Sequence, residues 1–268
     1  MSIKVLIRGG GDLASGIALR LYHAGAKVLI TELPAPVMVR RLVSFGQAVY
    51  QGSVTVEGVN GQLIHSAYEA EAVHQKGAVA VVVDPDLICL SAYQPDVLID
   101  CRMLKQPPET GLDAAVLVVG IGPGFTAGKD CHAVVETNRG HCMGRVYWQG
   151  QAQNDTRTPE SVLNHEADRV LRSPADGEIE VIPAIGSLIQ KGELIARISG
   201  HELRAPWFGV LRGILMSGLP VEAGMKIGDL DPRGEPKYCY LVSDKSLAVG
   251  GGVLEAILSR PDLRAKIA

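Results

Sequence analysis

The sequence predicts an α/β protein in which a mostly parallel sheet is accompanied by a second, all-β domain. The chain opens with an apolar run, a glycine turn and an amphipathic stretch, and later short apolar runs end in glycine or in a polar residue. A glycine-punctuated segment in the second half then repeats after 32 residues. A chain of 268 residues has room for two domains, since domains cluster near roughly 100 to 150 residues.

Composition excludes several classes of function. The 26 basic and 29 acidic residues nearly balance, and aromatic residues make up 4%, so we expect no nucleic acid and no anionic membrane as partner. The N-terminal residues lack the pattern of a signal peptide, and no apolar run approaches the roughly 20 residues that span a bilayer. Five scattered cysteines favour free thiols over zinc or disulfides. We therefore expect a cytoplasmic protein without a metal site; a homo-oligomer is compatible with the sequence.

The first unit has the pattern of a strand, a glycine turn, a helix and a second strand. In the spacing Gly9-x-Gly11-x-x-Ala14, the first glycine makes the turn, the second admits a pyrophosphate, and the small third residue lets helix pack on strand. Glu32 ends the second strand 23 residues after Gly9, where a carboxylate would accept a ribose hydroxyl. This predicts a Rossmann-like domain, although the glycines could serve packing alone. The predicted nucleotide-binding residues are Gly9, Gly11, Asp12 and Glu32.

Later apolar runs resemble buried parallel strands and end at Asp84, Asp100 and Gly120. Ligands of open α/β sheets bind outside the carboxyl ends of the strands, so we expect these residues to face one crevice with the first glycine turn. Helix capping is the alternative for the two aspartates. Before these runs, residues 37–50 are expected to be helical, and their two arginines to form a solvated face, with contact to a phosphate as the alternative.

A dense polar stretch, GIGPGFTAGKDCHAVVETNRGHCMGR, occupies residues 120–145. Its glycines free the backbone to turn and to approach a ligand, and its polar side chains suit an anion or cofactor site. The alternative is an ordinary crossover with an ion pair between Glu136 and Arg139. We predict Gly122 and Gly124 as cofactor-binding residues and Glu136, Arg139 and His141 as catalytic residues.

The internal repeat pairs LRSPADG, which begins at Leu171, with LRAPWFG, which begins at Leu203. Each copy has the pattern of short strands separated by glycine turns, which predicts two facing β-layers related by a pseudo-twofold. This segment, as far as Asp231, resembles the biotinyl/lipoyl barrel-sandwich family. Carrier members of that family have a lysine in the hairpin between the halves, but the hairpin here is Ser-Gly-His-Glu at residues 199–202. The resemblance therefore implies a docking or binding module without biotin or lipoate.

The tail is expected to return to the first domain. It has the pattern of a strand at residues 238–242, a glycine loop at 250–252 and a helix at 253–258. The predicted domains are a Rossmann-like nucleotide-binding domain at residues 1–150, a linker at 151–168, a barrel-sandwich domain at 169–235 and a tail at 236–268.

Together, the blocks RGGGDLASGIALRL, VVETNRGH, KIGDLDPRG and GGGVLEAIL resemble the YqeB-type accessory proteins of selenium-dependent molybdenum hydroxylase systems. The resemblance runs from about Lys4 to Leu258, and ETNRGH and DLDPRG are its most specific blocks. It implies a cytoplasmic maturation factor for molybdenum hydroxylases related to xanthine dehydrogenase. As a cofactor chaperone, such a protein would hold a molybdopterin dinucleotide in the Rossmann-like crevice and dock the apo-hydroxylase through the barrel-sandwich domain. The Rossmann-like part is similar, more faintly, to XdhC-type factors that handle sulfurated molybdenum cofactor.

Other chemistries stay open. The glycine fingerprint and Glu32 would serve NAD(P) equally well, so an NAD(P)-dependent oxidoreductase acting on a small molecule is the alternative function, with His132 or His141 as proton donor. These histidines and Glu136 could instead bind a metal if the stretch were helical, but the β-branched residues between them favour a strand. Selenium transfer through a cysteine needs a thiolate near positive charge, and Cys142 is the best placed.

Overall fold

The computed structural model describes residues 2–104, 108–154 and 169–267. The chain divides into two compact units, of which the first comprises Met1–Pro36, Phe45–Asp155 and Val242–Ala268, and the second Val37–Ser44 and Thr156–Leu241. Most of the predicted linker therefore lies outside the described residues. Within the described part of the chain, no helix has both the length and the apolar character needed to cross a membrane.

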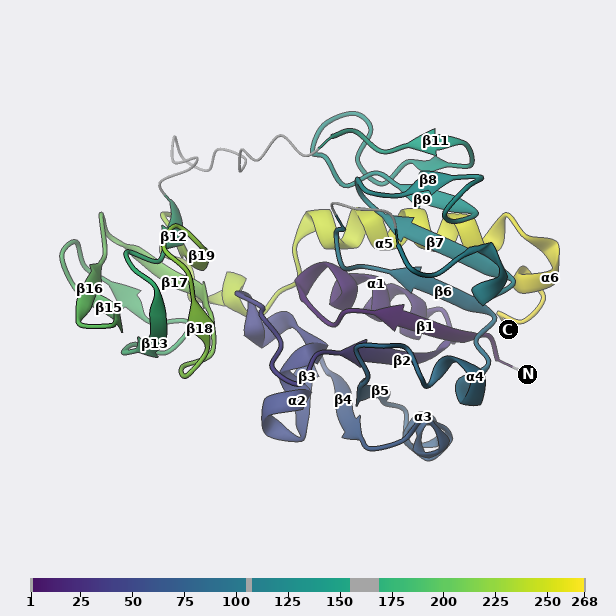
Figure 1. Cartoon of the computed structure of the whole chain (residues 1–268), viewed down its shortest axis with the longest axis horizontal. Coiled ribbons are helices and arrows are strands. Elements are labelled where there is room, and N and C mark those ends of the chain that lie inside the picture. Colours follow the sequence, from purple (N-terminus) through teal and green to yellow (C-terminus); the bar gives the residue numbers. More distant parts are fainter. Residues whose placement is uncertain (1, 105–107, 155–168, 268) are drawn as a thin grey trace. The chain divides into compact units, whose positions relative to one another are not determined.

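The first unit is built on a nine-stranded mixed sheet with the order β10-β9-β7-β6-β1-β2-β5-β4-β3 (Figure 1). Strands β9 to β4 in this order run parallel, whereas β10 and β3 pair antiparallel at the two edges. A two-stranded sheet, β8 with β11, completes the unit. The bounds are β1 Lys4–Arg8, β2 Lys27–Glu32, β3 Ser53–Val56, β4 Val59–Ile64, β5 Val79–Val83, β6 Val97–Asp100, β7 Leu117–Ile121, β8 Thr126–Ala127, β9 Ala133–Val135, β10 Val146–Tyr147 and β11 Gly150–Gln151.

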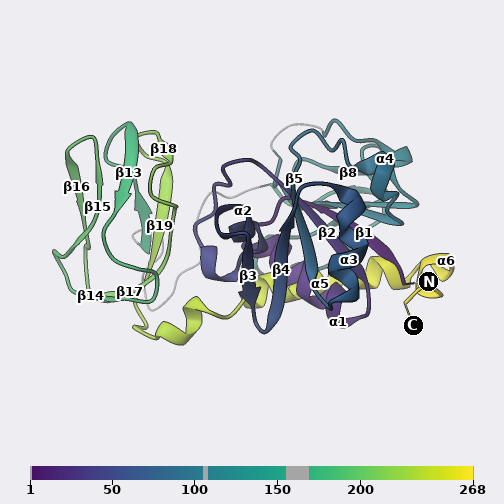
Figure 2. The same cartoon turned by 90° about the horizontal axis from the view of Figure 1, so that it is seen from below.

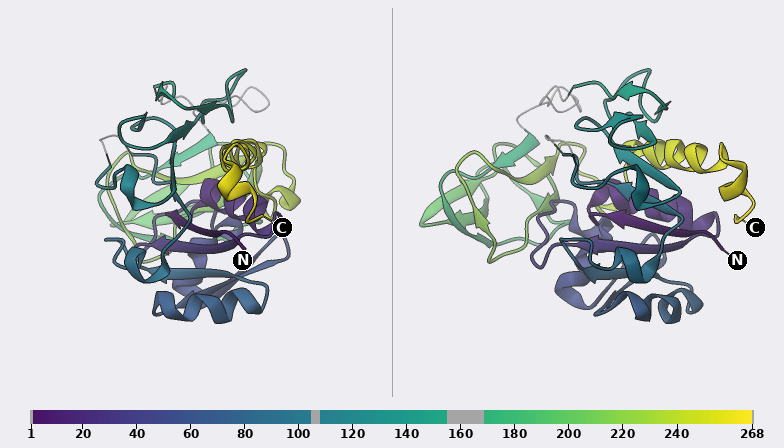
Figure 3. Two further views of the ribbon diagram at one scale, coloured as in Figure 1. Left: turned by 90° about the vertical axis from the view of Figure 1, so that its right-hand side faces the viewer. Right: turned by 45° about the vertical axis from the view of Figure 1, so that its right-hand side comes forward.

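Two long helices, α1 (Asp12–His23) and α5 (Asp244–Leu258), lie side by side on one face of this sheet, opposite α4 (Figures 2 and 3). Glycines permit their close approach. A Cβ at Gly16 would collide with Ser246, and one at Gly250 would lie 2.9 Å from Cγ of Arg20. The shorter elements are η1 Arg41–Val43, η2 Phe45–Gln47, α2 Ala48–Gln51, η3 Ala67–Glu69, α3 Ala70–Gln75, α4 Leu90–Tyr93, η4 Leu112–Ala114, η6 Pro236–Cys239 and α6 Pro261–Arg264.

The second unit consists of two four-stranded antiparallel sheets, β12-β19-β17-β14 and β16-β15-β13-β18. Shifting each strand of the first copy by 32 positions gives its counterpart in the second, and the same shift exchanges the two sheets. The two sheets share one apolar core, so the repeat predicted from sequence is confirmed at the level of strands. The bounds are β12 Val170–Arg172, β13 Gly177–Val181, β14 Leu188–Ile189, β15 Leu194–Ile198, β16 His201–Arg204, β17 Gly209–Ile214, β18 Pro220–Val221 and β19 Lys226–Asp231.

The predicted fold class, a Rossmann-like mostly parallel sheet with a biotinyl/lipoyl-like barrel-sandwich, is wrong. The large sheet is mixed, because the hairpins β3–β4 and β9–β10 add an antiparallel strand at each edge. The parallel strands β7 and β9 are joined through β8 and not through a crossover helix. The second unit is a pair of separate antiparallel sheets. Short apolar runs show burial but not the direction of a strand, and the prediction took every run as parallel.

Three local predictions are also corrected. Residues 37–50 form short 3-10 turns and the first residues of α2 instead of one helix, and the first of their arginines, Arg40, is buried and donates to the carbonyls of Tyr238 and Leu241. The predicted strand at 238–242 is replaced by the turn η6 and the residues after it. The predicted glycine loop at 250–252 lies inside α5, where Gly250 and Gly252 admit neighbouring backbone.

Candidate functional site

Four loops meet at the carboxyl edge of the large sheet, where the parallel strands β1, β6, β7 and β9 end. A Cβ at Gly9, after β1, would lie 3.7 Å from Cγ of Arg102, after β6. A Cβ at Gly122, after β7, would lie 2.8 Å from Oγ1 of Thr137, after β9. The edge therefore collects the glycine turn, the polar stretch and the ends of several strands in one place.

The turn between β1 and α1 contains three glycines, and the fold requires a glycine at only two of these positions. Gly9 has a φ of +92°, which side chains disfavour, and its N–H donates to the Thr31 carbonyl at 2.9 Å. A Cβ at Gly10 would lie 2.8 Å from the Gly46 nitrogen. Gly11 has neither constraint: its φ is −70°, and no described atom lies within 4 Å of a Cβ there. The space in front of Gly11 is therefore open.

Both predicted acidic residues reach this turn. Glu32 accepts from the Gly10 N–H through Oε1 at 2.8 Å and from the Leu33 N–H through Oε2 at 2.6 Å. Asp12, in the first turn of α1, accepts from the Ser246 hydroxyl at 3.1 Å. Gly11 is the N-cap of α1, and no described side chain caps the helix there. The structure thus brings Gly9, Gly11, Asp12 and Glu32 together around one helix N-terminus.

Internal packing accounts for the other two predicted cofactor-binding glycines. Gly122 and Gly124 have φ values of +77° and +99°. Side chains would collide with Thr137 at the first position and with the Leu104 carbonyl at the second. Both glycines therefore shape the loop after β7, whether or not a ligand approaches it.

Glu136 holds the loop after β9 together. Its side chain is fully buried, and Oε1 accepts from the N–H groups of Thr137 at 2.7 Å and Asn138 at 2.6 Å. Oε2 accepts from the Gln153 N–H at 2.8 Å. Three backbone amides thus surround this carboxylate, and the geometry gives it a positioning role.

Arg139 forms a bidentate pair with Asp244 at the start of α5, with both N–O distances at 2.6 Å. The Arg139 side chain is 32% exposed and that of Asp244 is 70% exposed. The guanidinium lowers the pKa of Asp244 to about 2 despite the opposing effect of partial burial. The ion pair between Glu136 and Arg139, which the sequence left as the alternative, does not form: Arg139 pairs with a residue 105 positions away. His141, two residues on, is exposed, and its carbonyl accepts from Arg145.

The groups considered for other chemistries have structural partners. Nδ1 of His132 accepts from the Val118 N–H at 3.0 Å, and burial lowers the pKa of this imidazole. The described residues contain no cluster of three or more His, Cys, Asp or Glu with a geometry that suits a metal. Cys142 is half-buried, and burial together with a hydrogen bond to Cys142 raises the pKa of Tyr147.

Sequence reasoning missed Arg8, Arg102, Glu109, Asp244 and Ser246, which also contribute to this edge. Arg8 donates to Glu109 at 3.0 Å, and Arg102 binds Asp100 at 2.7 Å and Glu109 at 2.8 Å. One signal was present in the sequence: a charged residue, Arg8, stands between a buried strand and the glycine turn. The other contacts join positions that no local pattern relates.

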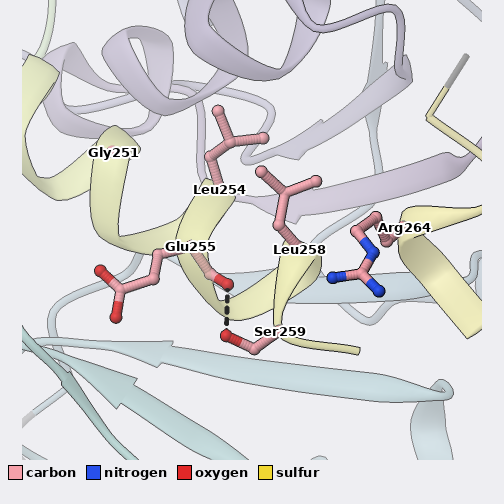
Figure 4. Close-up of a pocket in the computed structure, with 6 residues that line it drawn as sticks. All are labelled: Gly251, Leu254, Glu255, Leu258, Ser259 and Arg264. Carbon is pink, nitrogen blue, oxygen red and sulfur yellow. Dashed lines mark hydrogen bonds between the residues drawn. The ribbon is translucent and has the colours of Figure 1, made fainter. Parts of the chain in front are cut away.

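A depression of about 510 Å³ lies elsewhere, along the C-terminal half of α5 (Figure 4). Leu254 and Leu258 lie one turn apart on its wall, while Glu255 points away from them. The depression is open and lacks convergent polar groups, unlike a typical small-molecule site. We therefore place the candidate site at the carboxyl edge. The lining residues are Gly251, Leu254, Glu255, Leu258, Ser259 and Arg264.

No protein-family model matches the chain. The chain is 48% identical over 254 residues, 95% of its length, to the uncharacterized protein YqeB of Escherichia coli (strain K12), and it spans 47% of that relative. This similarity supports the YqeB-type relationship. Among solved structures, an aspartoacylase family protein from Mesorhizobium loti is 12% identical with a TM-score of 0.24, covering 86% of this chain and 85% of that one. A succinylglutamate desuccinylase from Silicibacter sp. is 14% identical with a TM-score of 0.24, covering 85% and 84%.

Proposed function

We propose that this protein is an accessory factor in the maturation of a selenium-dependent molybdenum hydroxylase, and that it binds a nucleotide-bearing molybdenum cofactor at the turn between β1 and α1. The observation that carries the binding site is Gly11, a glycine that neither its φ nor any described neighbour requires. A glycine at the N-cap leaves the N–H groups of the helix N-terminus accessible to the close approach of an anionic ligand. The resemblance through the ETNRGH and DLDPRG blocks supports the pathway.

The phosphates of such a cofactor suit the N-terminus of α1. The first N–H groups of a helix lack intrahelical partners and carry partial positive charge, which favours an anion. α1 begins at Asp12 without a described side-chain cap, and the turn before it is open at Gly11. Glu32 lies against the same turn, where its remaining lone pairs can accept ribose hydroxyls.

The loop after β9 would contact the rest of the cofactor. Arg139 and His141 are both accessible on this loop, and a guanidinium and an imidazole suit phosphate and polar pterin groups. Glu136 supports this contact indirectly, because its buried carboxylate fixes the backbone from which these side chains project. In this proposal the cofactor is cargo, and the chain's own residues bind it and orient it for the apo-hydroxylase.

Docking of the apo-hydroxylase is proposed for the second unit. Three exposed apolar side chains support a contact there: Leu188 at 51%, Phe208 at 46% and Tyr240 at 56%. Leu188 and Phe208 are neighbours, since a Cβ at Gly234 would lie 4.0 Å from one and 3.2 Å from the other.

Binding can be tested with Gly11→Val, using CTP and NAD as probes in isothermal titration calorimetry. The valine places a side chain where the pyrophosphate must approach, so we expect loss of binding with the fold retained. Gly251→Val is the matched control, since Gly251 also faces open space and has no positive φ. Equal affinities of the wild type and Gly11→Val would exclude this nucleotide site.

The pathway can be tested in cells with Arg139→Ala. We expect the hydroxylase polypeptide to stay at its normal level while its activity and its cofactor-bound selenium fall. Arg260→Ala is the control, because Arg260 is also a partly exposed arginine paired with an aspartate. A strain that lacks the protein and yet makes selenium-loaded, fully active hydroxylase would exclude the maturation role. NAD(P)-dependent oxidation of small alcohols and hydroxy acids would then be the next activity to measure.

A further inference from the structure

Two largely buried arginines share one exposed carboxylate at the carboxyl edge. Nη1 of Arg8 donates to Oε2 of Glu109 at 3.0 Å, and Nη2 of Arg102 donates to the same oxygen at 2.8 Å. The side chains of Arg8 and Arg102 are 9% and 24% exposed, whereas that of Glu109 is 70% exposed. The fixed part of this cluster is therefore the cationic pair, and the exposed part is the anion.

Both guanidiniums also have hydrogen-bond partners other than Glu109. Arg102 donates to Asp100 through Nε at 3.0 Å and through Nη2 at 2.7 Å, and Asp100 is 1% exposed. Arg8 donates through Nη2 to the Pro85 carbonyl at 2.9 Å. The nearby carboxylate of Asp84 does not bind either arginine through a described hydrogen bond, because its oxygens accept from the N–H groups of Ile88 and Cys89. The two arginines are thus oriented without Glu109, as a preformed anion site requires.

Two buried polar atoms in this row have no hydrogen-bond partner among the described residues. They are Nε of Arg8 and Oγ1 of Thr31, and their residues are 7% and 1% exposed. Arg8 and Thr31 are direct partners in the parallel pairing of β1 with β2, and Arg8 pairs with Asp100 of β6 in the same row. Side chains in one row project to the same face of a sheet. Unpartnered polar atoms at such a place indicate that a polar group completes the site.

We propose that Arg8 and Arg102 form an oxyanion site and that the Glu109 carboxylate occupies it as an internal competitor until a phosphate group displaces it. This inference rests on the proposed function and assigns the pair to a phosphate of the nucleotide-bearing ligand. The position fits, because the Arg102 side chain is the nearest neighbour of a Cβ at Gly9, in the glycine turn. A phosphate carries more charge than a carboxylate and has more acceptor oxygens, so it can replace Glu109 across the two guanidiniums.

The test is titration of inorganic pyrophosphate into the full chain by calorimetry. Glu109→Gln removes the competing charge but keeps the side-chain size, so we expect pyrophosphate to bind on the order of tenfold more tightly than to the wild type. Glu71→Gln is the matched control, because Glu71 is an exposed carboxylate that pairs with Lys27 at the first residue of β2. We expect its affinity to equal that of the wild type.

Arg102→Lys should weaken pyrophosphate binding when made alone, and should abolish the gain in affinity when combined with Glu109→Gln. Lysine keeps the positive charge but loses the paired N–H donors of the guanidinium. Arg8→Lys should do the same, and thermal unfolding verifies that each variant folds. Unchanged affinity in Glu109→Gln, or a gain that survives Arg102→Lys, would overturn the inference. Tighter binding of succinate than of pyrophosphate would overturn the phosphate assignment.

The two proposals fail in different ways. If Gly11→Val loses CTP binding while Glu109→Gln behaves as the wild type with pyrophosphate, the arginine site is wrong and the nucleotide site stands. If Glu109→Gln gains affinity while Gly11→Val still binds CTP and NAD normally, the arginine site stands and the nucleotide site is wrong.

Discussion

The Ser246 hydroxyl donates to the Asp12 carboxylate at 3.1 Å, although the two residues are 234 positions apart. Ser246 also hydrogen bonds through its hydroxyl to Ser243, the N-cap of α5, at 2.8 Å. This contact holds the first turns of α1 and α5 beside each other. Arg139 joins the same group through Asp244, so residues from both ends and the middle of the chain form one edge.

Gly10 and Gly11 should respond differently to alanine. A Cβ at Gly10 meets the backbone nitrogen of Gly46 at 2.8 Å, and backbone cannot move aside easily, so we expect Gly10→Ala to cost about 1–3 kcal/mol in the free energy of unfolding. Gly11→Ala meets open space and should cost less than about 1 kcal/mol, the usual effect at an N-cap. Urea unfolding measures both. Equal losses would show that Gly11 has a packing role.

Glu136→Gln should act on the stability of its loop. The amide of glutamine turns a donor towards backbone N–H groups that now donate to a carboxylate, so we expect a loss of about 1–3 kcal/mol. Hydrogen exchange should accelerate at Thr137, Asn138 and Gln153. Glu69→Gln is the control, since Glu69 accepts one exposed backbone bond at 3.2 Å. A fully stable Glu136→Gln variant would contradict the positioning role.

Asp231 stabilises the second unit. It is fully buried and accepts from Arg233 through Nε at 2.9 Å, and Arg212 lies 3.5 Å away. Removing the charge takes the carboxylate partner from Arg233, whereas Arg212 keeps Asp229, so Asp231→Asn should cost about 1.5–3 kcal/mol. Asp262→Asn, at an exposed pair, should be near neutral. Denaturant titration of both variants distinguishes a buried network from a surface one.

The free energy of unfolding should decrease in two steps as the pH is lowered. Burial lowers the pKa of His132 and of His74 below 6.5, so below that pH the unfolded chain takes up protons that the folded chain does not. Burial opposes ionisation of Asp231, but hydrogen bonds from Arg233 outweigh it and lower the pKa. Its contribution is therefore present above about pH 4 and is lost as the pH falls through the folded value.

The first step can be assigned by mutation. His132→Asn keeps an acceptor for the Val118 N–H but cannot titrate, so the loss of stability between pH 7 and pH 5 should shrink relative to the wild type. Thermal melts over this range measure the change. An unaltered pH profile would mean that His132 ionises equally in both states.

Local sequence patterns correctly predicted the elements whose formation depends on neighbouring residues. The opening apolar run and its glycines predicted a strand, a turn and a helix, and β1, α1 and β2 confirm these elements, because strand alternation and positive φ are properties of a few adjacent residues. The repeat after 32 residues likewise predicted matching strands, since similar sequences with glycine turns at the same positions form similar hairpins.

The sequence alone determined the unit of β1, glycine turn, α1 and β2, which residues are apolar enough to be buried, and that one segment is duplicated. Only the tertiary structure decided that the edge strands run antiparallel, that Arg139 pairs with Asp244 instead of Glu136, and that Glu109 lies across Arg8 and Arg102. These features depend on hydrogen bonds and ion pairs between residues that are distant in the chain or on separate strands. Packing of the whole sheet chooses the partners of Arg139 and Arg8, and no window of adjacent residues contains that information; the β3–β4 hairpin, by contrast, turns over Glu57 and Gly58.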